Sequence, residues 1–337
     1  MSTLTQKISR LIEATGSISV AEYMALCLYD SEHGYYTTRE PFGGAGDFTT
    51  APEISQMFGE LVGVWLYAAW QACNAPRNAV FAEIGPGRGT LMKDMLRTFG
   101  KLDPTLLTGH RFALVETSPR LAAVQKKTLA GAQADLKWHT RVEDLPGGAL
   151  FIVGNEIFDA VPIRQYVKTE AGWRERAVGL ADDGSLAFAA GPGTLPSPLL
   201  PPGADEAANG AIFEIAPARE ALMEAIAARL ARTGGAGMFI DYGYEGPSLG
   251  DTLQAVRRHS YDGVLANPGE ADLTAHVDFV PLAEIARVHG LEAQLMPQGE
   301  FLIGLGLLER AGRLGAGRTK EEQEQIRTDV ERLAGPD

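Results

Sequence analysis

Apolar residues near the start of the chain recur at the spacing of an α-helix, and a glycine at position 16 follows them as a stop signal. The apolar positions of this first predicted helix are Leu4, Ile8, Leu11 and Ile12. A capping box, Ser19-x-x-Glu22, predicts that a second helix begins there. A third helix is expected to start near Pro52 and to carry a broad apolar face. Residues 1–76 are therefore predicted to form an N-terminal helical cap.

The segment from residue 33 to residue 55 joins the second predicted helix to the third and is rich in glycine and aromatic residues. It is longer than a connection between two helices needs, and loops of this length are usually functional or disordered. We expect it to be a lid that closes over a bound cofactor, with its aromatic side chains packing on the ligand. These aromatic residues are Tyr35, Tyr36, Phe42 and Phe48.

Short apolar runs alternate with helical patterns from residue 78 onward. The predicted strands lie in the segments AVFAEIG, RFALVETSP, LKWH, ALFIVGNEIFDAVP and GMFIDYG, and the second ends in an acid and the fourth in polar residues. Strands and helices that alternate in this way predict an α/β fold, an open parallel sheet doubly wound with helices. Residues 163–195 break the alternation and are typical of β-hairpins, which turn at Ala-Gly and at Asp-Asp-Gly. This segment is therefore expected to be an insertion.

Three parts follow from these patterns. Residues 1–76 are the helical cap with its cofactor-covering loop, and residues 77–310 are the core, with insertions near 163–210 and 245–280. Residues 311–337 are a C-terminal tail. A second capping box, Thr319-x-x-Glu322, predicts a helix in this tail.

Composition and charge narrow the function classes. Of 337 residues, 45% are hydrophobic and 22% are charged, which is typical of a globular protein and excludes a fibrous or disordered chain. The net charge of −13 disfavours nucleic acid and anionic membrane surfaces as partners. The longest uncharged apolar run, residues 61–76, is shorter than the ~20 residues of a membrane span. The N-terminus resembles neither a signal peptide nor a transit peptide, so we expect a cytoplasmic protein.

A glycine-rich turn follows the first predicted strand of the core, in the segment Glu83-Ile-Gly85-Pro-Gly87-Arg-Gly89. Glycines at this place let the backbone approach a ligand, and the helix behind them offers free N–H groups. The spacing differs from the GxGxxG of dinucleotide-binding folds, because Thr90 stands where the last glycine would be. The acid before the turn would also repel a pyrophosphate. This acid suits a cationic ligand, and the glycine spacing disfavours a nicotinamide dehydrogenase.

A second acid, Glu116, ends the next strand, where a carboxylate can accept hydrogen bonds from both ribose hydroxyls. A ligand that combines a ribose with an α-amino group and a sulfonium is S-adenosylmethionine. The two acids and the three glycines therefore indicate a site for this cofactor. The alternative is an ordinary tight turn followed by a surface acid, which explains the three alternating glycines less well.

An amide and a carboxylate, Asn155 and Glu156, follow the fourth strand and should emerge at the same sheet edge as the glycine turn. The amide could orient a nitrogen nucleophile through its carbonyl oxygen, and the carboxylate through charge-assisted hydrogen bonds. The alternative is helix capping, with Asn155 as the N-cap residue. Further acids lie on or beside predicted strand ends, and each alone is more often a cap or a surface group. They are Asp159, Glu214 and Asp241.

No metal site is expected, because His276 has no cysteine or carboxylate at the spacing of metal ligands.

Seven segments together resemble one family. They are GDFTTAPEISQMFGE, EIGPGRGTLMKD, LVETSP, NEIFDAVPIRQ, IDYGYEG, GDTLQAVRRH and DLTAHVDF. The chain resembles the MidA-like S-adenosylmethionine-dependent methyltransferases over roughly residues 7 to 310. The resemblance implies a class I methyltransferase core, which is Rossmann-like, with an N-terminal helical cap and inserted segments. The family's closing strand has no matching segment here, which leaves the last sheet position open.

The resemblance also implies roles for individual residues. Glu83, Gly85, Gly87 and Gly89 would hold the methionine part of S-adenosylmethionine, and Glu116 would take the ribose. A cap over the cofactor would be formed by Asp47, Phe48, Thr49 and Glu53. Asn155 and Glu156 would face the substrate, with Asp159, Glu214 and Asp241 as further candidates for orienting the nucleophile.

Mitochondrial members of this family symmetrically dimethylate an arginine of a respiratory complex I core subunit near the quinone site. The resemblance therefore implies a protein-arginine methyltransferase whose partner is the equivalent subunit of a bacterial enzyme. Two alternatives stay open: a methyltransferase with a small-molecule acceptor, and a cofactor-binding assembly chaperone whose methylation is vestigial. The sequence leaves the oligomeric state undetermined.

Overall fold

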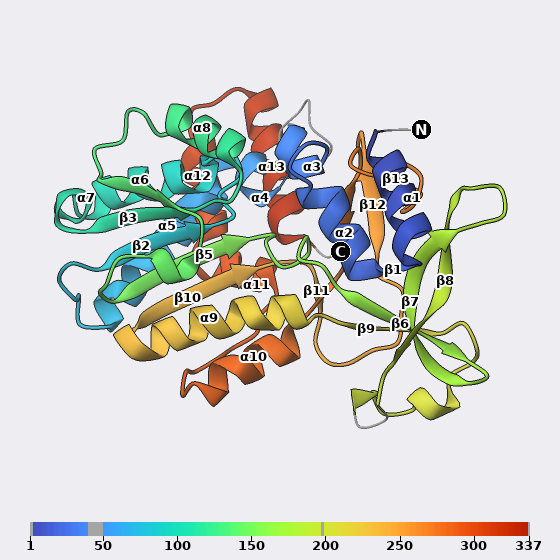
Figure 1. The fold of residues 1–337 in the computed structure, drawn as a ribbon. Coiled ribbons are helices and arrows are strands. Elements are labelled where there is room, and N and C mark those ends of the chain that lie inside the picture. The colour runs from blue at the N-terminus through green and yellow to red at the C-terminus, as the bar shows by residue number, and fades with distance from the viewer. Residues whose placement is uncertain (1–2, 40–49, 197–198, 336–337) are drawn as a thin grey trace. The chain divides into compact units, whose positions relative to one another are not determined.

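The computed structural model describes residues 3–39, 50–196 and 199–335, which form two compact units (Figure 1). The first unit comprises Met1–Phe48, Phe158–Glu224 and Asp241–Ile285. The second comprises Thr49–Ile157, Ala225–Ile240 and Ala286–Asp337. These boundaries divide the predicted cap of residues 1–76, because its first helices belong to the unit that holds the insertions and its last helix belongs to the other.

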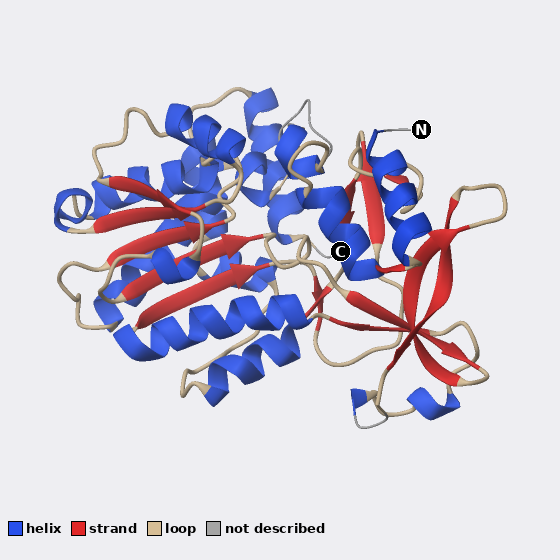
Figure 2. Ribbon diagram, in the orientation of Figure 1, coloured by secondary structure: helices blue, strands red, loops and turns tan. Residues whose placement is uncertain are grey.

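A five-stranded parallel sheet lies at the centre of the second unit (Figure 2). Its strands are β2 (Val80–Ile84), β3 (Arg111–Val115), β4 (Leu136–His139), β5 (Leu150–Asn155) and β10 (Gly235–Ile240). The order across the sheet is β10-β5-β2-β3-β4, and every pairing is parallel. The predicted doubly wound parallel sheet is confirmed. Because the strand order reverses at β2, ligands of such sheets bind beside its carboxyl end.

Helices lie on both faces of this sheet, with α6 and α8 on one side and α9 on the other (Figure 1). Two of them, α9 and α10, begin in the first unit and end in the second. The helices are α4 (Ala51–Ile54), α5 (Gln56–Ala72), α6 (Thr90–Leu102), α7 (Thr105–Gly109), α8 (Pro119–Thr128), η1 (Val142–Asp144), α9 (Pro217–Thr233), α10 (Phe279–Val288), α11 (Gln298–Gly304), α12 (Leu307–Gly315) and α13 (Lys320–Ala334). Within the described residues, no strand after β10 joins this sheet.

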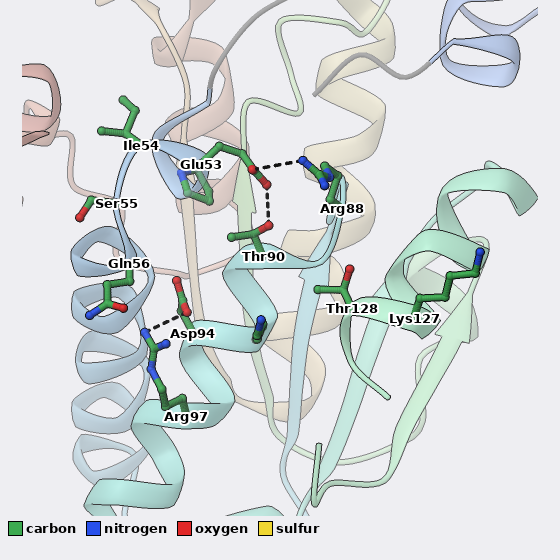
Figure 3. Close-up of a pocket in the computed structure, with 12 residues that line it drawn as sticks. Glu53, Ile54, Ser55, Gln56, Arg88, Thr90, Asp94, Arg97, Lys127 and Thr128 are labelled. Atoms are coloured by element: carbon green, nitrogen blue, oxygen red, sulfur yellow. Dashed lines mark hydrogen bonds and ion pairs between the residues drawn. The ribbon is translucent and has the colours of Figure 1, made fainter. Parts of the chain in front are cut away.

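The expectation of one helix starting near Pro52 was wrong, because the segment forms two helices, α4 and α5, separated at Ser55 (Figure 3). Ser55 has an extended backbone, with φ −154° and ψ 141°, so the helical hydrogen-bond ladder cannot run through it. Its hydroxyl accepts a hydrogen bond from the backbone N–H of Met57 and thereby caps α5. The second helix therefore starts at the serine rather than at the proline.

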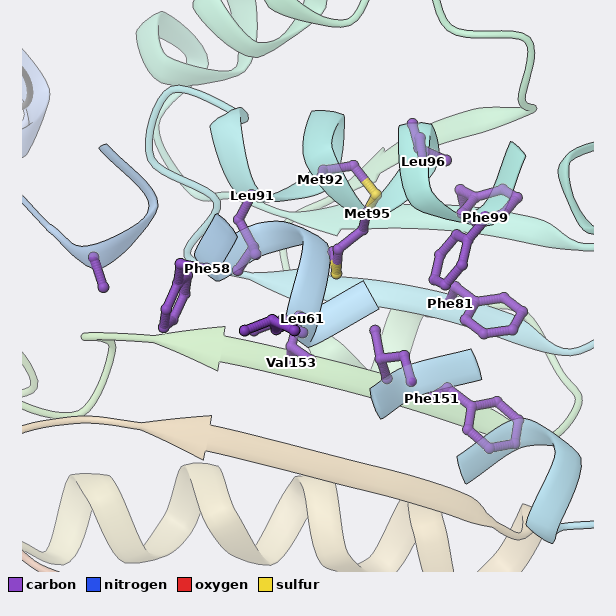
Figure 4. Packing of buried hydrophobic residues seen from close by; sticks show 14 of the residues in the cluster. Phe58, Leu61, Phe81, Leu91, Met92, Met95, Leu96, Phe99, Phe151 and Val153 are labelled. Atoms are coloured by element: carbon purple, nitrogen blue, oxygen red, sulfur yellow. The ribbon is translucent and has the colours of Figure 1, made fainter. Parts of the chain in front are cut away.

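The apolar core of the second unit lies between α5, α6 and the sheet (Figure 4). Phe81 of β2 stacks on Phe112 of β3 and on Phe151 of β5, with ring centroids 5.5 and 5.4 Å apart. Burying each such ring contributes about 1.5–3 kcal/mol. The C-terminal helices complete this core with Leu302, Leu307 and Leu333. The predicted helix of the C-terminal tail is thus confirmed as α13, and its capping box is formed.

The first unit contains the N-terminal helices and three small sheets. Its helices are α1 (Thr3–Thr15), α2 (Val20–Tyr29), α3 (Tyr35–Thr38) and η3 (Ala204–Glu206). Its strands are β1 (Ile18–Ser19), β6 (Arg164–Thr169), β7 (Gly172–Leu180), β8 (Leu186–Thr194), β9 (Ile212–Ile215), β11 (Gly243–Tyr244), β12 (Gln254–Arg257), β13 (Ser260–Asp262), β14 (Asp272–Thr274) and β15 (Val277–Asp278). The predicted hairpins are confirmed, since β6, β7 and β8 pair in antiparallel fashion.

The expectation that the loop from residue 33 to residue 55 presents all its aromatic residues to a ligand was wrong for Tyr35. Tyr35 begins the short helix α3 and is fully buried in the core of the first unit. Tyr36 packs against it edge to face, with ring centroids 5.2 Å apart. Burial of the Tyr35 ring in the core of its own unit outweighs the polar composition of the loop. Phe42 and Phe48 lie outside the described residues.

No helix in the described part of the chain is both long and apolar enough to cross a membrane.

Candidate functional site

The glycine turn between β2 and α6 has a backbone that favours glycine at all three positions. The φ angles are +63° at Gly85, +50° at Gly87 and +83° at Gly89, which is the left-handed region. A Cβ at Gly85 would also lie 2.5 Å from Cγ2 of Ile157. Gly89 is the N-cap residue of α6 and makes no side-chain cap, so the turn brings bare backbone and a helix N-terminus to the edge of the sheet.

Glu83 stands on β2 just before this turn and is only 3% exposed. Its Oε2 is buried and has no hydrogen-bond partner within the described part of the chain. Burial raises the pKa of Glu83 to about 8; the N–H of Met92 lowers it, and the nearby charge of Glu116 adds to the rise. A buried carboxyl with an unused oxygen is costly by itself, and a cationic ligand would stabilise its charged form.

Glu116 follows β3 at the same edge of the sheet, and both of its carboxylate oxygens are held. Oε1 accepts a hydrogen bond from the backbone N–H of Ser118 at 2.7 Å, and Oε2 accepts one from Nε2 of Gln125 at 2.9 Å. Burial raises the pKa of Glu116, and these two hydrogen bonds lower it again. The carboxylate is thus fixed in one orientation beside the glycine turn.

Asn155 and Glu156 lie at the carboxyl end of β5, one strand away from the glycine turn. Gly154 pairs with Ile84 of β2, so Asn155 comes level with Gly85 across the sheet. Nδ2 of Asn155 donates to Oε1 of Glu156 at 3.0 Å, while Oδ1 of Asn155 is buried and has no partner among the described residues. The alternative of helix capping is wrong, because residues 156–163 form turns and bends and no helix begins there.

The backbone of Glu156 holds this arrangement. Its φ of +50° is in the left-handed region, which costs a residue with a side chain about 1 kcal/mol or more. The backbone N–H of Glu156 donates to the carbonyl of Ile240 on β10 at 2.7 Å, and this bond helps to offset the cost. The sharp turn of the chain here directs the carboxylate back toward the amide of Asn155.

Glu53 of α4 contacts the end of the glycine turn and the first residue of α6 (Figure 3). Its carboxylate accepts a hydrogen bond from the hydroxyl of Thr90 and pairs with Arg88 at 3.6 Å. Beside it lies a cavity of about 610 Å³, lined by Pro52, Glu53, Ile54, Ser55, Gln56, Arg88, Thr90, Lys93, Asp94, Arg97, Lys127 and Thr128. The other expected cap residues, Asp47, Phe48 and Thr49, lie outside the described residues.

The three further acids belong to the first unit, where each takes part in hydrogen bonds of that unit. Oδ2 of Asp241 accepts from the backbone N–H groups of Phe158 and Asp159, so Asp241 and Asp159 are neighbours. Asp159 is buried, which raises its pKa, and it accepts a hydrogen bond from the Tyr242 hydroxyl at 2.7 Å. Glu214 accepts hydrogen bonds from Gln165 and from Thr252. Each of the three carboxylates therefore has hydrogen-bond partners within its own unit, and its role in orienting the nucleophile stays a prediction.

No group of three or more side chains suited to holding a metal ion occurs among the residues that the structure describes.

Comparison with known proteins decides the family. Residues 61–296 match a family of S-adenosyl-L-methionine-dependent methyltransferases. The chain belongs to this family. Protein arginine methyltransferase NDUFAF7 of Danio rerio, a mitochondrial protein, is 35% identical over 358 residues, which cover 99% of this chain and 84% of that protein. The Homo sapiens protein of the same name is 37% identical over 324 residues, which cover 88% of this chain and 71% of that protein.

A solved structure agrees with these sequence matches. A Burkholderia thailandensis protein bound to S-adenosyl-homocysteine superposes on the methyltransferase with a TM-score of 0.83 and 27% sequence identity. The match covers 98% of this chain and 89% of that protein. The resemblance stated from the sequence is thereby confirmed, together with the class I fold and S-adenosylmethionine as the cofactor.

The residues of the methyltransferase fit this cofactor. S-adenosylmethionine carries a sulfonium and an α-ammonium group. The buried Oε2 of Glu83, which has no partner among the residues that the structure describes, is suited to a cation. Gly85, Gly87 and Gly89 leave the backbone bare where the ligand would lie, and the oriented carboxylate of Glu116 would hold ribose hydroxyls.

One residue of the site was missed by the sequence reasoning. Gln125 is fully buried in α8 and bonds both to Glu116 and to the carbonyl of Gly87. A lone glutamine in a helix with few apolar residues is normally predicted to lie at the surface. The sequence therefore contains no signal that distinguishes Gln125 from an exposed residue.

Proposed function

We propose that this methyltransferase transfers methyl groups to an arginine side chain of a protein substrate. The observation that carries the proposal is the state of Asn155, whose buried Oδ1 lacks a hydrogen-bond partner within the described residues. Its Nδ2 is occupied by Glu156, so the carbonyl oxygen is the group left to receive a donor. An N–H of a nitrogen nucleophile would satisfy this oxygen, which supports a nitrogen acceptor.

The neighbouring carboxylate of Glu156 makes arginine the best fit among nitrogen nucleophiles. A guanidinium has a pKa above ~12, so it reaches the site charged, with its lone pair delocalised. A carboxylate beside it accepts charge-assisted hydrogen bonds and draws positive charge away from the nitrogen that attacks. When bound, S-adenosylmethionine supplies the electrophilic methyl group. The chain's own residues orient the nitrogen in line with it and exclude water.

The nature of the substrate rests on relatives and on charge. The Danio rerio and Homo sapiens relatives are named protein arginine methyltransferases. The net charge of −13 favours a basic protein segment over a small neutral acceptor. The resemblance to the MidA-like family supports the narrower proposal that the arginine belongs to a core subunit of respiratory complex I. It also supports symmetric dimethylation as the product.

The experiment is methyl transfer in solution with the purified chain. The quinone-site core subunit of a bacterial complex I is incubated with the enzyme and isotopically labelled S-adenosylmethionine, and the product is digested and sequenced by mass spectrometry. We expect two methyl groups on one arginine, with the fragments of the symmetric isomer. A control subunit with that arginine changed to lysine should stay unlabelled.

Other outcomes decide against the proposal in distinct ways. Label on a small molecule from a cell extract and none on protein would make the enzyme a small-molecule methyltransferase. Cofactor binding with no transfer to protein or extract would leave the assembly chaperone. Label on lysine or on a carboxylate would refute the assignment of arginine while keeping a protein substrate.

A further inference from the structure

Gln125 of α8 connects three separate elements of the second unit with one side-chain amide. Its Nε2 donates to the carbonyl oxygen of Gly87 in the glycine turn at 2.9 Å and to Oε2 of Glu116 after β3, also at 2.9 Å. Its Oε1 accepts from Nε1 of Trp138 on β4 at 2.9 Å. The residue is 0% exposed, so water does not compete for any of these bonds.

The chemistry of the partners fixes which way the amide faces. The indole nitrogen of Trp138 can only donate, so it must meet the oxygen of the amide. The two N–H groups of Gln125 then point at two acceptors, a carbonyl and a carboxylate. A flipped amide would place N–H against N–H and oxygen against oxygen, and would lose all three bonds.

The backbone of α8 at Gln125 is packed closely against the glycine turn. A Cβ built on Gly89 would lie 3.5 Å from the Cα of Gln125, so α8 packs directly on the glycine turn. The other oxygen of the Glu116 carboxylate is held by the N–H of Ser118. Because the Gly87 carbonyl and the Glu116 carboxylate both bind the same Nε2, the directions of its two N–H bonds set the separation between these two groups.

We propose that Gln125 is the positioning residue of the cofactor site, which holds the Gly87 turn and the Glu116 carboxylate at the separation that S-adenosylmethionine requires. It acts through these two groups and need not touch the cofactor. The inference rests on the assignment of Glu116 to the ribose, so the experiment tests that assignment separately.

The test measures the Kd of S-adenosyl-homocysteine and of S-adenosylmethionine by titration calorimetry. Gln125→Met keeps the length and apolar bulk of the side chain but loses all three hydrogen bonds. We expect both Kd values to rise ten- to a hundredfold, the range for losing hydrogen bonds to a charged group. The kcat at saturating cofactor should change less than threefold, because the reacting groups are untouched.

Gln125→Glu gives a signature that a packing role would not give. A neutral glutamic acid can still donate once and accept once, whereas an ionised one repels Glu116 in a buried site. The ratio of the variant's Kd to the wild-type Kd should therefore rise with pH between 6 and 9. The same ratio for Gln125→Met should be constant over that range.

Gln165→Met is the matched control. Gln165 is also 0% exposed, donates to Glu214 and Asp251, and accepts from Arg176 in the first unit. It should lower the melting temperature about as much as Gln125→Met while leaving both Kd values unchanged. Equal loss of affinity in the two variants would overturn the proposal, since it would reflect general destabilisation.

A double variant separates Gln125 from Glu116. If Gln125 acts through the carboxylate, Gln125→Met should weaken binding much less in a Glu116→Ala background than in the wild type. Full additivity, or an unchanged Kd in Gln125→Met, would refute the positioning role. An unchanged Kd in Glu116→Ala alone would instead refute the ribose assignment.

Discussion

Replacing Glu83 by glutamine should remove the pH dependence of cofactor binding. Burial raises the pKa of Glu83 to about 8 in the free protein, so at pH 6 only about one molecule in a hundred has the charged carboxylate. S-adenosylmethionine is a cation and favours that charged form. The wild-type Kd should therefore fall about tenfold per pH unit from pH 6 toward pH 8, and level off above it. Glu83→Gln should bind more weakly at pH 9 and show no such slope.

The same pKa shift should appear in the stability of the free protein. The carboxyl titrates near its ordinary pKa of 4.5 in the unfolded chain and near 8 in the folded one. The folded state thus binds more protons between these values, so the contribution of Glu83 to the free energy of unfolding is largest below pH 4.5, declines as the pH rises from 4.5 to 8, and is constant above that. At about 1.4 kcal/mol per pH unit, the total decline is about 5 kcal/mol. Glu83→Gln should lack this decline and be the more stable protein at pH 9.

The assays are titration calorimetry with S-adenosylmethionine and urea unfolding without ligand, both from pH 6 to pH 9. Glu60→Gln is the control, because Glu60 is a buried acid of the same unit. Burial raises its pKa less than Arg310, Arg97 and Lys101 together lower it, so it is ionised throughout this range. It should leave the pH slope of the Kd intact. A wild-type Kd that is equal at pH 6 and pH 8, or a slope that persists in Glu83→Gln, would refute the reasoning.

Three further outcomes are expected. Asn155→Ala removes the unpartnered acceptor, so methyl transfer should fall at least tenfold while the Kd of S-adenosylmethionine changes less than threefold; an equal loss in both would place Asn155 in the cofactor shell. Gly87→Val puts a β-branched residue at a φ of +50°, so calorimetry should show no binding of S-adenosyl-homocysteine, with a folded circular dichroism spectrum as the check. Phe81→Ala removes a ring that stacks on two others and should lower the free energy of unfolding by about 3–5 kcal/mol in urea, whereas a loss below about 1 kcal/mol would contradict the packing described.

Local signals in the sequence predicted much of the cofactor site. The alternation of strands and helices predicted the parallel sheet. The carboxyl ends of parallel strands lie at one edge of the sheet, independently of the length and conformation of the loops. The glycine turn could be recognised because positive φ angles favour glycine, and the acids at 83 and 116 are adjacent to strand ends. Both capping boxes also depend on residues three apart and formed as predicted. The roles of the individual site residues and the cytoplasmic location stay predictions.

Other features depend on segments far apart in the chain. The burial of Tyr35, the division of residues 1–76 between two units, and the placement of Asp159, Glu214 and Asp241 in the first unit follow from how the insertions pack with the N-terminal helices. The pattern of apolar residues fixes which face of an element is buried, but it carries no information on which other element covers that face.

Gln125 illustrates the difference. The sequence predicted that a helix follows β3, but this helix has few apolar residues, so their spacing did not mark Gln125 as buried. Only the tertiary structure brought the amide of Gln125 within hydrogen-bond reach of Gly87, 38 residues earlier, and of Trp138, 13 residues later. A buried polar side chain finds its hydrogen-bond partners only when the fold brings distant segments together. A hydrogen bond requires donor and acceptor atoms to lie about 3 Å apart, and the spacing of residues along the chain does not specify this distance.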